Sequence, residues 1–282
     1  MKKIIFSICL ILCTTFAFAD GKQDSLLIVK ADWATKTTPE GLTHKQAQIK
    51  GLFNSVQSIN LIEIPRSAKL KIGVAGNEGM KPTSQQASEK GALAAINGTY
   101  YNMKVGNSTC YYKIDRELID NTLDSEFKLR VNGAVRERRG NIKIIKWTKD
   151  IEASHKGKRG TVLASGPIML EDGCISDWSA CGKSFIETRH PRSAIYTKKD
   201  GTIVFITVDG RSEGNAAGVS IPELAFLIKM LGGEEAINLD GGGSTTLWLK
   251  GAPDNGVLNY PTDNQKFDHT GERSVSNIFY VK

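Results

Sequence analysis

The sequence predicts an α+β fold, a β-rich mixed sheet with a few packed helices in a single domain. Short apolar runs separated by turn residues recur along the chain, and Ile203–Val208 and Val275–Val281 are the clearest strands. One strong helical pattern follows Ser220, where Leu224 and Leu227 begin an apolar stripe at helical spacing. The chain has 282 residues, enough for one large core, and shows no internal repeats.

The first half of the chain predicts mostly strands. From the N-terminus we expect a polar connection at 41–50, strands at 55–64, 69–74 and 92–96, and a short helix at 82–91. Thr83 or Ser84 is the expected N-cap of that helix. A polar break at Asp115-Arg116-Glu117 divides the segment 111–119 into a hairpin.

The second half adds further strands and the main helix. We expect strands at 127–131, 142–147, 161–164, 168–170, 236–239, 245–249 and 275–281. Segments 193–196 and 203–208 form a hairpin, because Lys198-Lys199-Asp200-Gly201 is a strong turn signal. In the helix, Ser220 is the N-cap and Pro222 and Glu223 occupy the first turn, while Gly232 or Gly233 ends it.

Two aspartates directly follow apolar strands in this order. Asp209-Gly210-Arg211 comes after the strand at 203–208, and Asp240 comes after the strand at 236–239, with a helix between them. If these two strands are parallel neighbours, both carboxylates emerge at the same edge of the sheet. Open α/β units commonly bind ligands at that edge.

Three consecutive glycines, Gly241, Gly242 and Gly243, stand between Asp240 and Ser244. Such a run costs backbone entropy on folding, so close approach of a ligand is one reason for it. The backbone amides would then face an anion or a hydroxyl-rich sugar. The alternative is a plain hairpin loop in which Asp240 bonds the amides of its own turn.

Several motifs together resemble the phosphodiester glycosidase family. They are Ala94–Tyr101, Ser165-Gly166-Pro167, Arg189–Ala194, Thr207–Arg211, Asn238–Thr246 and Arg273–Asn277. The Asp-Gly-Gly-Gly-Ser loop, in company with Asp-Gly-Arg and His-Pro-Arg, is the most specific part. Thr99 stands where the family pattern has a glycine. The resemblance spans roughly Asn97 to the C-terminus.

The resemblance implies hydrolysis of a sugar-1-phosphodiester, of the N-acetylglucosamine-1-phosphodiester kind, at the anomeric carbon. The departing phosphate monoester is weakly basic, so cationic donors and one carboxylate are the main needs of the site. We expect catalytic roles for Asp209, Asp240 and His190. The expected substrate-binding residues are Asn97, Gly98, Arg192, Arg211, Gly241, Gly242, Gly243, Ser244, Thr245 and Arg273. We expect no required cofactor and no catalytic metal, and a structural Ca²⁺ is compatible with the sequence.

Other readings of the same residues remain open. Taken singly, each aspartate is more often a turn residue and each arginine a surface charge, while His190 or Asn97 can simply bond the backbone. One alternative function is a glycan-binding or exopolysaccharide envelope module without turnover, which uses Tyr100, Tyr101, Tyr111 and Tyr112. Another is a metal-assisted phosphodiesterase with ligands from Asp209, Asp240, Asp268 or His269.

The N-terminus predicts a signal peptide at residues 1–19. Met1-Lys2-Lys3 is basic, Ile4–Leu12 is apolar, and Ala17-Phe18-Ala19 is a small-x-small cleavage pattern. The domain then spans 20–282, with an N-terminal portion at 20–90 and the family motifs from 94 to 282. We expect a secreted or periplasmic protein of the cell envelope, without a transmembrane segment in the mature chain.

Cysteines and charge complete the expectations. Cys174 and Cys181 flank a short loop and are the expected disulfide, with Cys110 free and buried, although all three can also be reduced. The net charge is +7, and much of it lies in 130–159. We favour a solvated surface there, with attraction to anionic glycans as the alternative. We expect a carbohydrate phosphodiester or anionic glycan as the partner rather than nucleic acid, and we expect a monomer.

Overall fold

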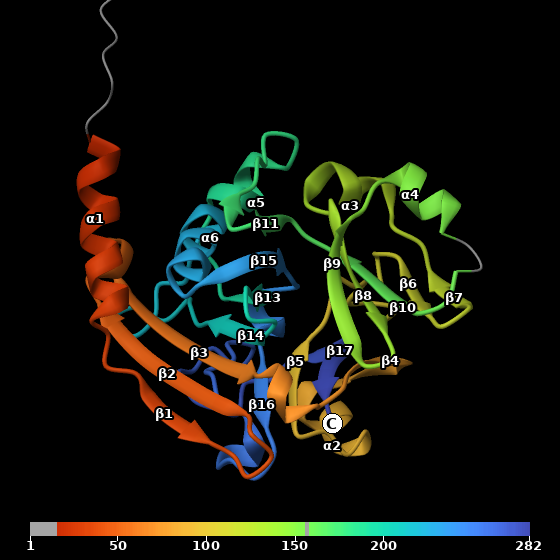
Figure 1. Ribbon diagram of the computed structural model, residues 1–282, viewed down its shortest axis with the longest axis horizontal. Helices are drawn as coiled ribbons and strands as arrows, with labels where there is room; N and C mark the ends of the chain where they lie inside the picture. Colours follow the sequence, from red (N-terminus) through yellow and green to blue (C-terminus); the bar gives the residue numbers. More distant parts are fainter. Residues whose placement is uncertain (1–15, 156–157) are drawn as a thin grey trace, which may run out of the picture.

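The computed structural model describes residues 16–155 and 158–282, and the predicted α+β class is confirmed (Figure 1). Three sheets pack around a shared core, and helices cover their outer faces. The predicted signal peptide lies almost wholly outside the described residues; helix α1 (Phe16–Val29) runs across its expected end. No helix in the described ranges is long and apolar enough to span a membrane.

The largest sheet has eight strands, and every neighbouring pair is antiparallel. Their order across the sheet is β1 (Ala34–Thr37), β2 (Thr43–Lys50), β3 (Val56–Ile64), β14 (Ile203–Val208), β13 (Arg192–Lys198), β15 (Gly233–Asn238), β11 (Ile168–Glu171) and β12 (Cys174–Ile175). Helices α1 and α6 (Ile221–Met230) pack on one face, where Ile28 and Leu224 meet Ile206.

Two smaller sheets close the other side. The four-stranded sheet runs β16 (Leu247–Leu249), β5 (Ala94–Asn97), β17 (Ser274–Val281) and β4 (Ile72–Pro82). The five-stranded sheet runs β7 (Glu117–Asp120), β6 (Tyr112–Ile114), β10 (Thr161–Ser165), β8 (Gly133–Arg138) and β9 (Asn141–Lys146). Short helices join strands of these two sheets: α2 (Thr83–Glu89), α3 (Asp124–Leu129) and α4 (Lys149–Ser154). Helix α5 (Lys183–Glu187) lies between β12 and β13 of the large sheet.

A common core explains why the chain forms one domain. Phe205 and Ile237 of the large sheet, Phe279 of the four-stranded sheet and Leu163 of the five-stranded sheet are all fully buried in one apolar cluster. Burial of each such side chain stabilises the fold by about 1.5–3 kcal/mol. Because the cluster draws on all three sheets, none of them buries its apolar face alone.

Helix α6 begins as the sequence predicts. The Ser220 side chain accepts a hydrogen bond from the Glu223 backbone N–H, and the Glu223 carboxylate accepts one from the Ser220 backbone N–H. This capping box satisfies two amides that the first helical turn leaves unpaired. Glu223 also pairs with Arg189, so the start of α6 is tied to the segment that leads into β13.

Two element predictions are wrong. Residues 124–129 form helix α3, not a strand, because the Glu126 carboxylate binds Arg130 one turn later and the Thr109 hydroxyl. Residues 41–50 are mostly strand β2 rather than a connection. Its polar side chains face outward, while Ala47 and Ile49 alternate into the core beneath α6.

The predicted neighbourhood of the glycine run also needs correction. Strands β14 and β15 are parallel to one another, but β13 lies between them. Strands β15 and β16 are not a hairpin, because they belong to different sheets. The glycine run therefore carries the chain from the large sheet to the four-stranded one.

The predicted Cys174–Cys181 disulfide is absent. Cys174 is exposed on edge strand β12, whereas Cys181 turns toward the core beside Trp178, so the two thiols take different directions. Cys110 is free and buried, as expected. Burial raises the pKa of the Cys110 thiol, and burial likewise raises that of Cys181.

Candidate functional site

The ends of β14 and β15 place Asp209 and Asp240 at one edge of the large sheet, with the start of β13 between them. Their side chains have different neighbours. Asp209 contacts Ser58, Asn259 and Tyr260, whereas Asp240 lies near Arg130 and Arg273. Among the described residues no hydrogen-bond partner is common to the two carboxylates. A single cleft that holds both carboxylates stays a prediction.

Asp209 is fully enclosed by hydrogen-bond donors. It is 1% exposed, and its carboxylate accepts bonds from the Ser58 hydroxyl at 2.7 Å, the Asn259 side-chain amide at 3.0 Å and the Tyr260 backbone N–H at 2.9 Å. Burial raises the pKa of Asp209, against the lowering effect of these donors. The geometry gives Asp209 a positioning role, since it ties β3 and β14 to the loop after β16.

Asp240 has the opposite character. Its side chain is partly exposed, and its carboxylate accepts a hydrogen bond of 2.9 Å from the Gly241 backbone N–H. Burial raises the pKa of Asp240, while the Ser244 hydroxyl and the nearby Arg130 and Arg273 guanidinium groups lower it. Asp240 is thus a carboxylate with solvent access and cationic neighbours, the combination that a reacting group needs.

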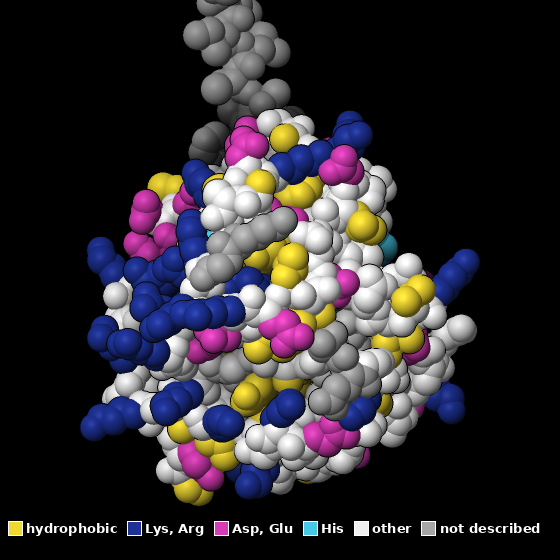
Figure 2. Space-filling model, turned by 90° about the vertical axis from the view of Figure 1, so that its right-hand side faces the viewer, with side chains coloured by type: hydrophobic (Ala, Val, Ile, Leu, Met, Phe, Trp, Pro, Cys, Tyr) yellow, Lys and Arg dark blue, Asp and Glu magenta, His cyan; other side chains and the backbone are white. Residues whose placement is uncertain are grey.

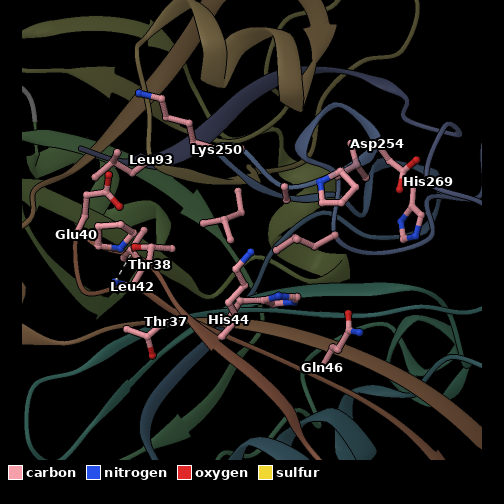
Figure 3. A pocket seen from close by; sticks show the side chains of 18 residues that line it. Thr37, Thr38, Glu40, Leu42, His44, Gln46, Leu93, Lys250, Asp254 and His269 are labelled. Atoms are coloured by element: carbon pink, nitrogen blue, oxygen red, sulfur yellow. Dashed lines mark hydrogen bonds between the residues drawn. The ribbon is translucent and has the colours of Figure 1, made fainter.

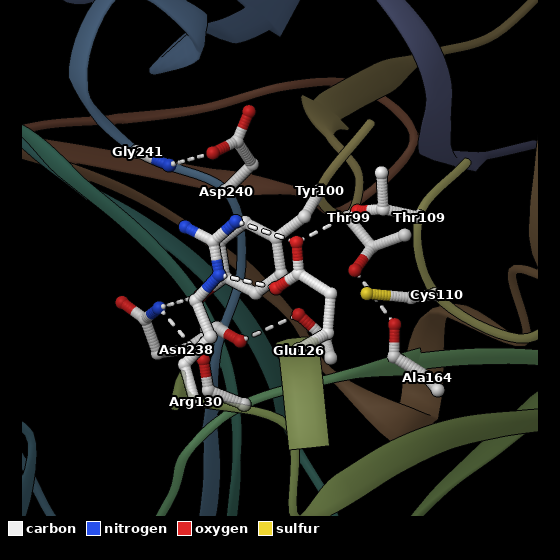
Figure 4. Close-up of polar contacts among 12 residues, drawn as sticks. Thr99, Tyr100, Thr109, Cys110, Glu126, Arg130, Ala164, Asn238, Asp240 and Gly241 are labelled. Carbon is white, nitrogen blue, oxygen red and sulfur yellow. Dashed lines mark hydrogen bonds and ion pairs between the residues drawn. The ribbon is translucent and has the colours of Figure 1, made fainter. Parts of the chain in front are cut away.

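Arg130 is a member of this site that the sequence reading missed. Its guanidinium lies 3.5 Å over the centre of the Tyr100 ring and forms a two-pronged pair with Glu126 (Figure 4). Asp240 lies beside this stack in the same view. Tyr100 in turn donates its hydroxyl to Gly166 O at 2.6 Å. No local motif marks Arg130, which comes from the basic stretch treated as a solvated surface.

The glycine run packs directly beneath two arginines. A side chain at Gly242 would approach the Arg211 guanidinium to 2.9 Å, and one at Gly243 would collide with the Arg273 guanidinium. Gly242 also has φ +63°, which favours glycine. The expected contact with Arg211 is present, and Arg273 takes the place expected of Arg192. Arg273 pairs with Asp263, whereas Arg211 has only a 3.5 Å contact with His190 Nδ1.

Most backbone amides of the run already bond groups of the protein. Gly241 N–H donates to Asp240, Gly242 N–H donates to Pro191 O, and Ser244 N–H donates to Gly241 O. The expected cradle of amides is therefore largely used up inside the protein. What the glycines provide is the absence of side chains under Arg211 and Arg273.

Four of the expected binding residues bond backbone groups around the site: Arg192, Asn97, Gly98 and Thr245. Arg192 is 2% exposed and donates to the backbone oxygens of Val219, Phe185 and Thr188, and burial lowers its pKa to about 10. Asn97 donates to Asp240 O at 2.7 Å and accepts from Ser193 and Thr246.

Gly98 and Thr245 complete this supporting layer. Gly98 O accepts the Asp240 amide, and a side chain at Gly98 would collide with Asn277. Thr245 is buried, and its carbonyl accepts from Asn259. These residues hold the Asp240 backbone in place rather than offer groups to a ligand.

His190 and Tyr101 border the partly exposed side. Burial lowers the pKa of His190, and the positive charges of Arg192 and Arg211 lower it further, so the imidazole is neutral near pH 7. Tyr101 is half-buried, donates its hydroxyl to Ser274 O at 2.8 Å, and has its pKa raised by burial. Both rings lie within reach of the charged groups around Asp240.

A cavity of about 560 Å³ lies elsewhere, between the β1–β2 hairpin and the segment after β16 (Figure 3). His44 and His269 line it, together with apolar side chains such as Leu42. None of the residues around Asp240 lines it. Across the described ranges, no group of three or more His, Cys, Asp or Glu side chains is placed to hold a metal ion.

This arrangement can be compared with known proteins. The profile of the phosphodiester glycosidase family matches residues 90–282, which include Asp240, the glycine run and all four arginines. The chain belongs to the phosphodiester glycosidase family.

The relatives that this chain matches are distant in sequence. The chain is 24% identical over 197 residues to N-acetylglucosamine-1-phosphodiester alpha-N-acetylglucosaminidase of Bos taurus. This match covers 64% of this chain and 34% of that protein. It is also 24% identical over 233 residues to SPbeta prophage-derived uncharacterized protein YomE of Bacillus subtilis (strain 168), covering 82% and 34%. The chain thus spans about a third of the length of the curated relatives it matches.

The fold is shared with a solved member of the phosphodiester glycosidase family. The catalytic domain of zebrafish N-acetylglucosamine-1-phosphodiester alpha-N-acetylglucosaminidase, auto-inhibited by its pro-peptide, superposes with a TM-score of 0.63 at 18% identity. The match covers 89% of this chain and 82% of that one. The α+β architecture described above is therefore the family fold.

Proposed function

We propose that this phosphodiester glycosidase hydrolyses a sugar-1-phosphodiester, of the N-acetylglucosamine-1-phosphodiester kind, at the anomeric carbon. The observation that carries the proposal is one partly exposed carboxylate, Asp240, beside three arginines and a loop without side chains. Carboxylate and guanidinium groups in one place match a substrate with an electrophilic carbon bonded to a phosphate.

Arg211 and Arg273 are the proposed phosphate ligands. Arg211 is exposed and forms no ion pair among the described residues, so its planar fork is available for two phosphate oxygens. Arg273 shares its charge with Asp263, which fixes its direction over Gly243. Arg130 is held by Glu126 and Tyr100, and it supports the charge of Asp240.

In the proposed reaction the anomeric carbon–oxygen bond breaks and the phosphate monoester leaves with that oxygen. Asp240 either activates the attacking water or attacks the carbon itself, after which water releases the sugar. Because the leaving phosphate is weakly basic, no strong general acid is required. Neutral His190, next to Arg211, is a proton shuttle in this scheme.

The proposal includes export of the enzyme from the cytoplasm. The predicted signal peptide at 1–19 would deliver the enzyme to the periplasm or the outside of the cell, where phosphodiester-linked sugars of envelope polymers are candidate substrates. A site for calcium or another ion is not needed for the chemistry proposed.

The deciding experiment uses ¹⁸O-labelled water and a sugar-1-phosphodiester such as N-acetylglucosamine-1-phosphomethyl ester. Label in the sugar, analysed by mass spectrometry, is the expected result. Label in the phosphate would contradict it and favour the metal-assisted phosphodiesterase. No turnover, together with saturable binding of the same ester, would favour a glycan-binding module. Asp240→Asn is the control that must abolish any labelling.

A further inference from the structure

A groove of about 940 Å³ lies at the end of the large sheet opposite Asp240. Its walls are the connection from β3 to β4, the β8–β9 turn and the turn between β13 and β14. Strand β13 begins at Arg192, near the candidate site, and ends at Lys198, which lines the groove. Six residues of extended strand separate the two by roughly 20 Å, so this is a second location.

The rim of the groove is strongly cationic. The lining side chains with positive charge are Arg66, Lys69, Lys71, Arg139, Lys143 and Lys198. Lys198 pairs with Glu63 at 2.7 Å. Within the described part of the chain none of the other five forms an ion pair, and all five are exposed.

Acidic side chains are fewer than basic ones in the lining of the groove. Glu235 is the acidic side chain there; it accepts a hydrogen bond from the Asp172 amide, and burial raises its pKa, as do the nearby negative charges of Asp172, Glu171 and Glu234. Glu137, in the neighbouring turn, accepts the Gly140 amide at 2.7 Å. Figure 2 shows lysine and arginine side chains gathered on one side of a molecular face, next to exposed apolar atoms.

The floor of the groove is apolar. Leu70, Ile144 and Ile203 line it and are only partly buried against the inter-sheet core. A purely ionic ligand would satisfy the rim and leave this floor in contact with water. A ligand with an anionic head and a hydrocarbon part would cover both.

We propose that this groove binds an anionic phospholipid at a membrane surface. The phosphate head lies among the five unpaired cations and the upper part of an acyl chain lies on Leu70, Ile144 and Ile203. Basic residues near an anionic bilayer contribute roughly 1 kcal/mol each, about a fivefold change in affinity. The groove would hold the enzyme on an envelope membrane with Asp240 at the far end of the sheet.

The test uses the full protein and sedimentation with vesicles of phosphatidylglycerol in phosphatidylcholine. We expect salt-sensitive binding that pure phosphatidylcholine vesicles do not show. The triple variant K69Q/K71Q/K143Q should weaken it on the order of a hundredfold. The control triple K22Q/K30Q/K229Q removes the same charge from exposed positions outside the groove. Lys22 lies in α1, Lys30 directly follows α1, and Lys229 lies in α6. This control should change affinity less than about threefold.

A further variant separates a lipid from a soluble polyanion. Ile144→Ser should weaken vesicle binding several-fold and leave binding of dextran sulfate unchanged, with the melting temperature recorded for each variant. Equal weakening by both lysine triples would overturn the proposal, since net charge alone would then explain binding. So would absence of binding to phosphatidylglycerol vesicles, or vesicle binding that Ile144→Ser does not alter in a folded protein.

Discussion

Asp209 and Asp240 share the local sequence Asp-Gly after a buried strand, yet their surroundings differ in one decisive respect. Three donors from two separate segments, Ser58 and Asn259-Tyr260, bind the Asp209 carboxylate in the interior. The Asp240 carboxylate accepts one backbone bond and has the Ser244 hydroxyl and the guanidinium groups of Arg130 and Arg273 nearby. A turn motif alone does not distinguish these cases, because the donors come from residues remote in sequence.

Replacement of each aspartate by asparagine should separate the two roles. Asp240→Asn removes the reacting charge, and kcat/KM for a sugar-1-phosphodiester should fall on the order of a thousandfold or more. Asp209→Asn keeps shape, since the new amide can donate to the Ser58 hydroxyl while its oxygen accepts from Asn259. Steady-state kinetics should therefore show an effect of less than about tenfold for Asp209→Asn. Equal losses in both variants would contradict the assignment.

The pH dependence should report Asp240. Its pKa is raised by burial in the folded protein, so kcat/KM should be lost as pH falls through a value above the ordinary aspartate pKa of about 3.9. Arg273→Gln removes a cation that lowers this pKa, so the acid limb should move to higher pH as well as lose amplitude. A pH–rate profile measures both. An unchanged midpoint in Arg273→Gln would show that another group controls the acid limb.

The same shift has a consequence for stability. A carboxyl group with a raised folded pKa favours folding when protonated, below its unfolded pKa, and this contribution is lost as pH rises through the folded pKa. At neutral pH the charged Asp240 therefore does not stabilise the fold, and Asp240→Asn should melt no lower than the wild type. Thermal unfolding at pH 7 checks this and confirms that lost activity is not lost structure.

Arg130 shows the limit of sequence reading at the level of single residues. Asp240, Arg211 and Arg273 were found because they lie within motifs, and the structure brings them together. Arg130 has no motif and reaches the site only through α3, a helix that the sequence did not predict. Arg192 lies in a motif but donates its hydrogen bonds to backbone carbonyls. A sequence pattern does not show which partner a side chain takes.

Among the elements, the loop at Gly241–Gly243 connects two sheets rather than two strands of one hairpin. This crossing explains why it is packed tightly on both sides, against Pro191 O on one and the arginines on the other. Two positions of this loop require glycine for different physical reasons. Gly242 needs its positive φ, whereas Gly243 is required by the space that Arg273 and Asp263 occupy.

Alanine substitutions should separate these reasons. Gly243→Ala places a methyl group within 2.7 Å of Asp263 and closer still to Arg273, so it should displace this pair. We expect turnover to fall at least tenfold with a small change in melting temperature. Gly242→Ala adds backbone strain and should destabilise the fold by about 1 kcal/mol or more. If Gly243→Ala leaves kinetics unaltered, Arg273 does not contact the substrate.

Most strands and the main helix follow from local pattern, and the exceptions have a physical cause. Helix α6 has its cap, its first-turn proline and its apolar stripe within eleven residues, so its sequence is self-sufficient. Helix α3 depends on a Glu126–Arg130 pair and on Thr109, and strand β2 depends on pairing with β3. Where partners across the fold decide the structure, propensity is a weak guide.

On the scale of the whole molecule, helix α1 ties the N-terminal segment to the large sheet. Ile28 is 2% exposed in the core beneath α6, and Asp24 accepts the Phe53 backbone N–H at 2.9 Å. Both residues lie after the expected cleavage at Ala19. The mature protein would therefore keep the contacts that anchor this helix.

Two truncations test this anchoring. A protein that starts at Asp20 should melt within a few degrees of the full chain, because the contacts of Asp24 and Ile28 remain. One that starts at Asp32 removes them and uncovers the cluster beneath α6, which should cost about 2–4 kcal/mol. Calorimetry of both forms gives the answer. Equal melting of the two would show that α1 is not part of the stable fold.

Strand β17 has a consequence for the order in which this fold is made. It lies inside its sheet, where Ile72 of β4 and Ala94 of β5 both pair with Val281. Strands β4 and β5 emerge from the ribosome early, but neither finds this shared neighbour until the 274–281 segment has been synthesised. Closure over such a distance is slow, so completion of the four-stranded sheet waits for residues 274–281.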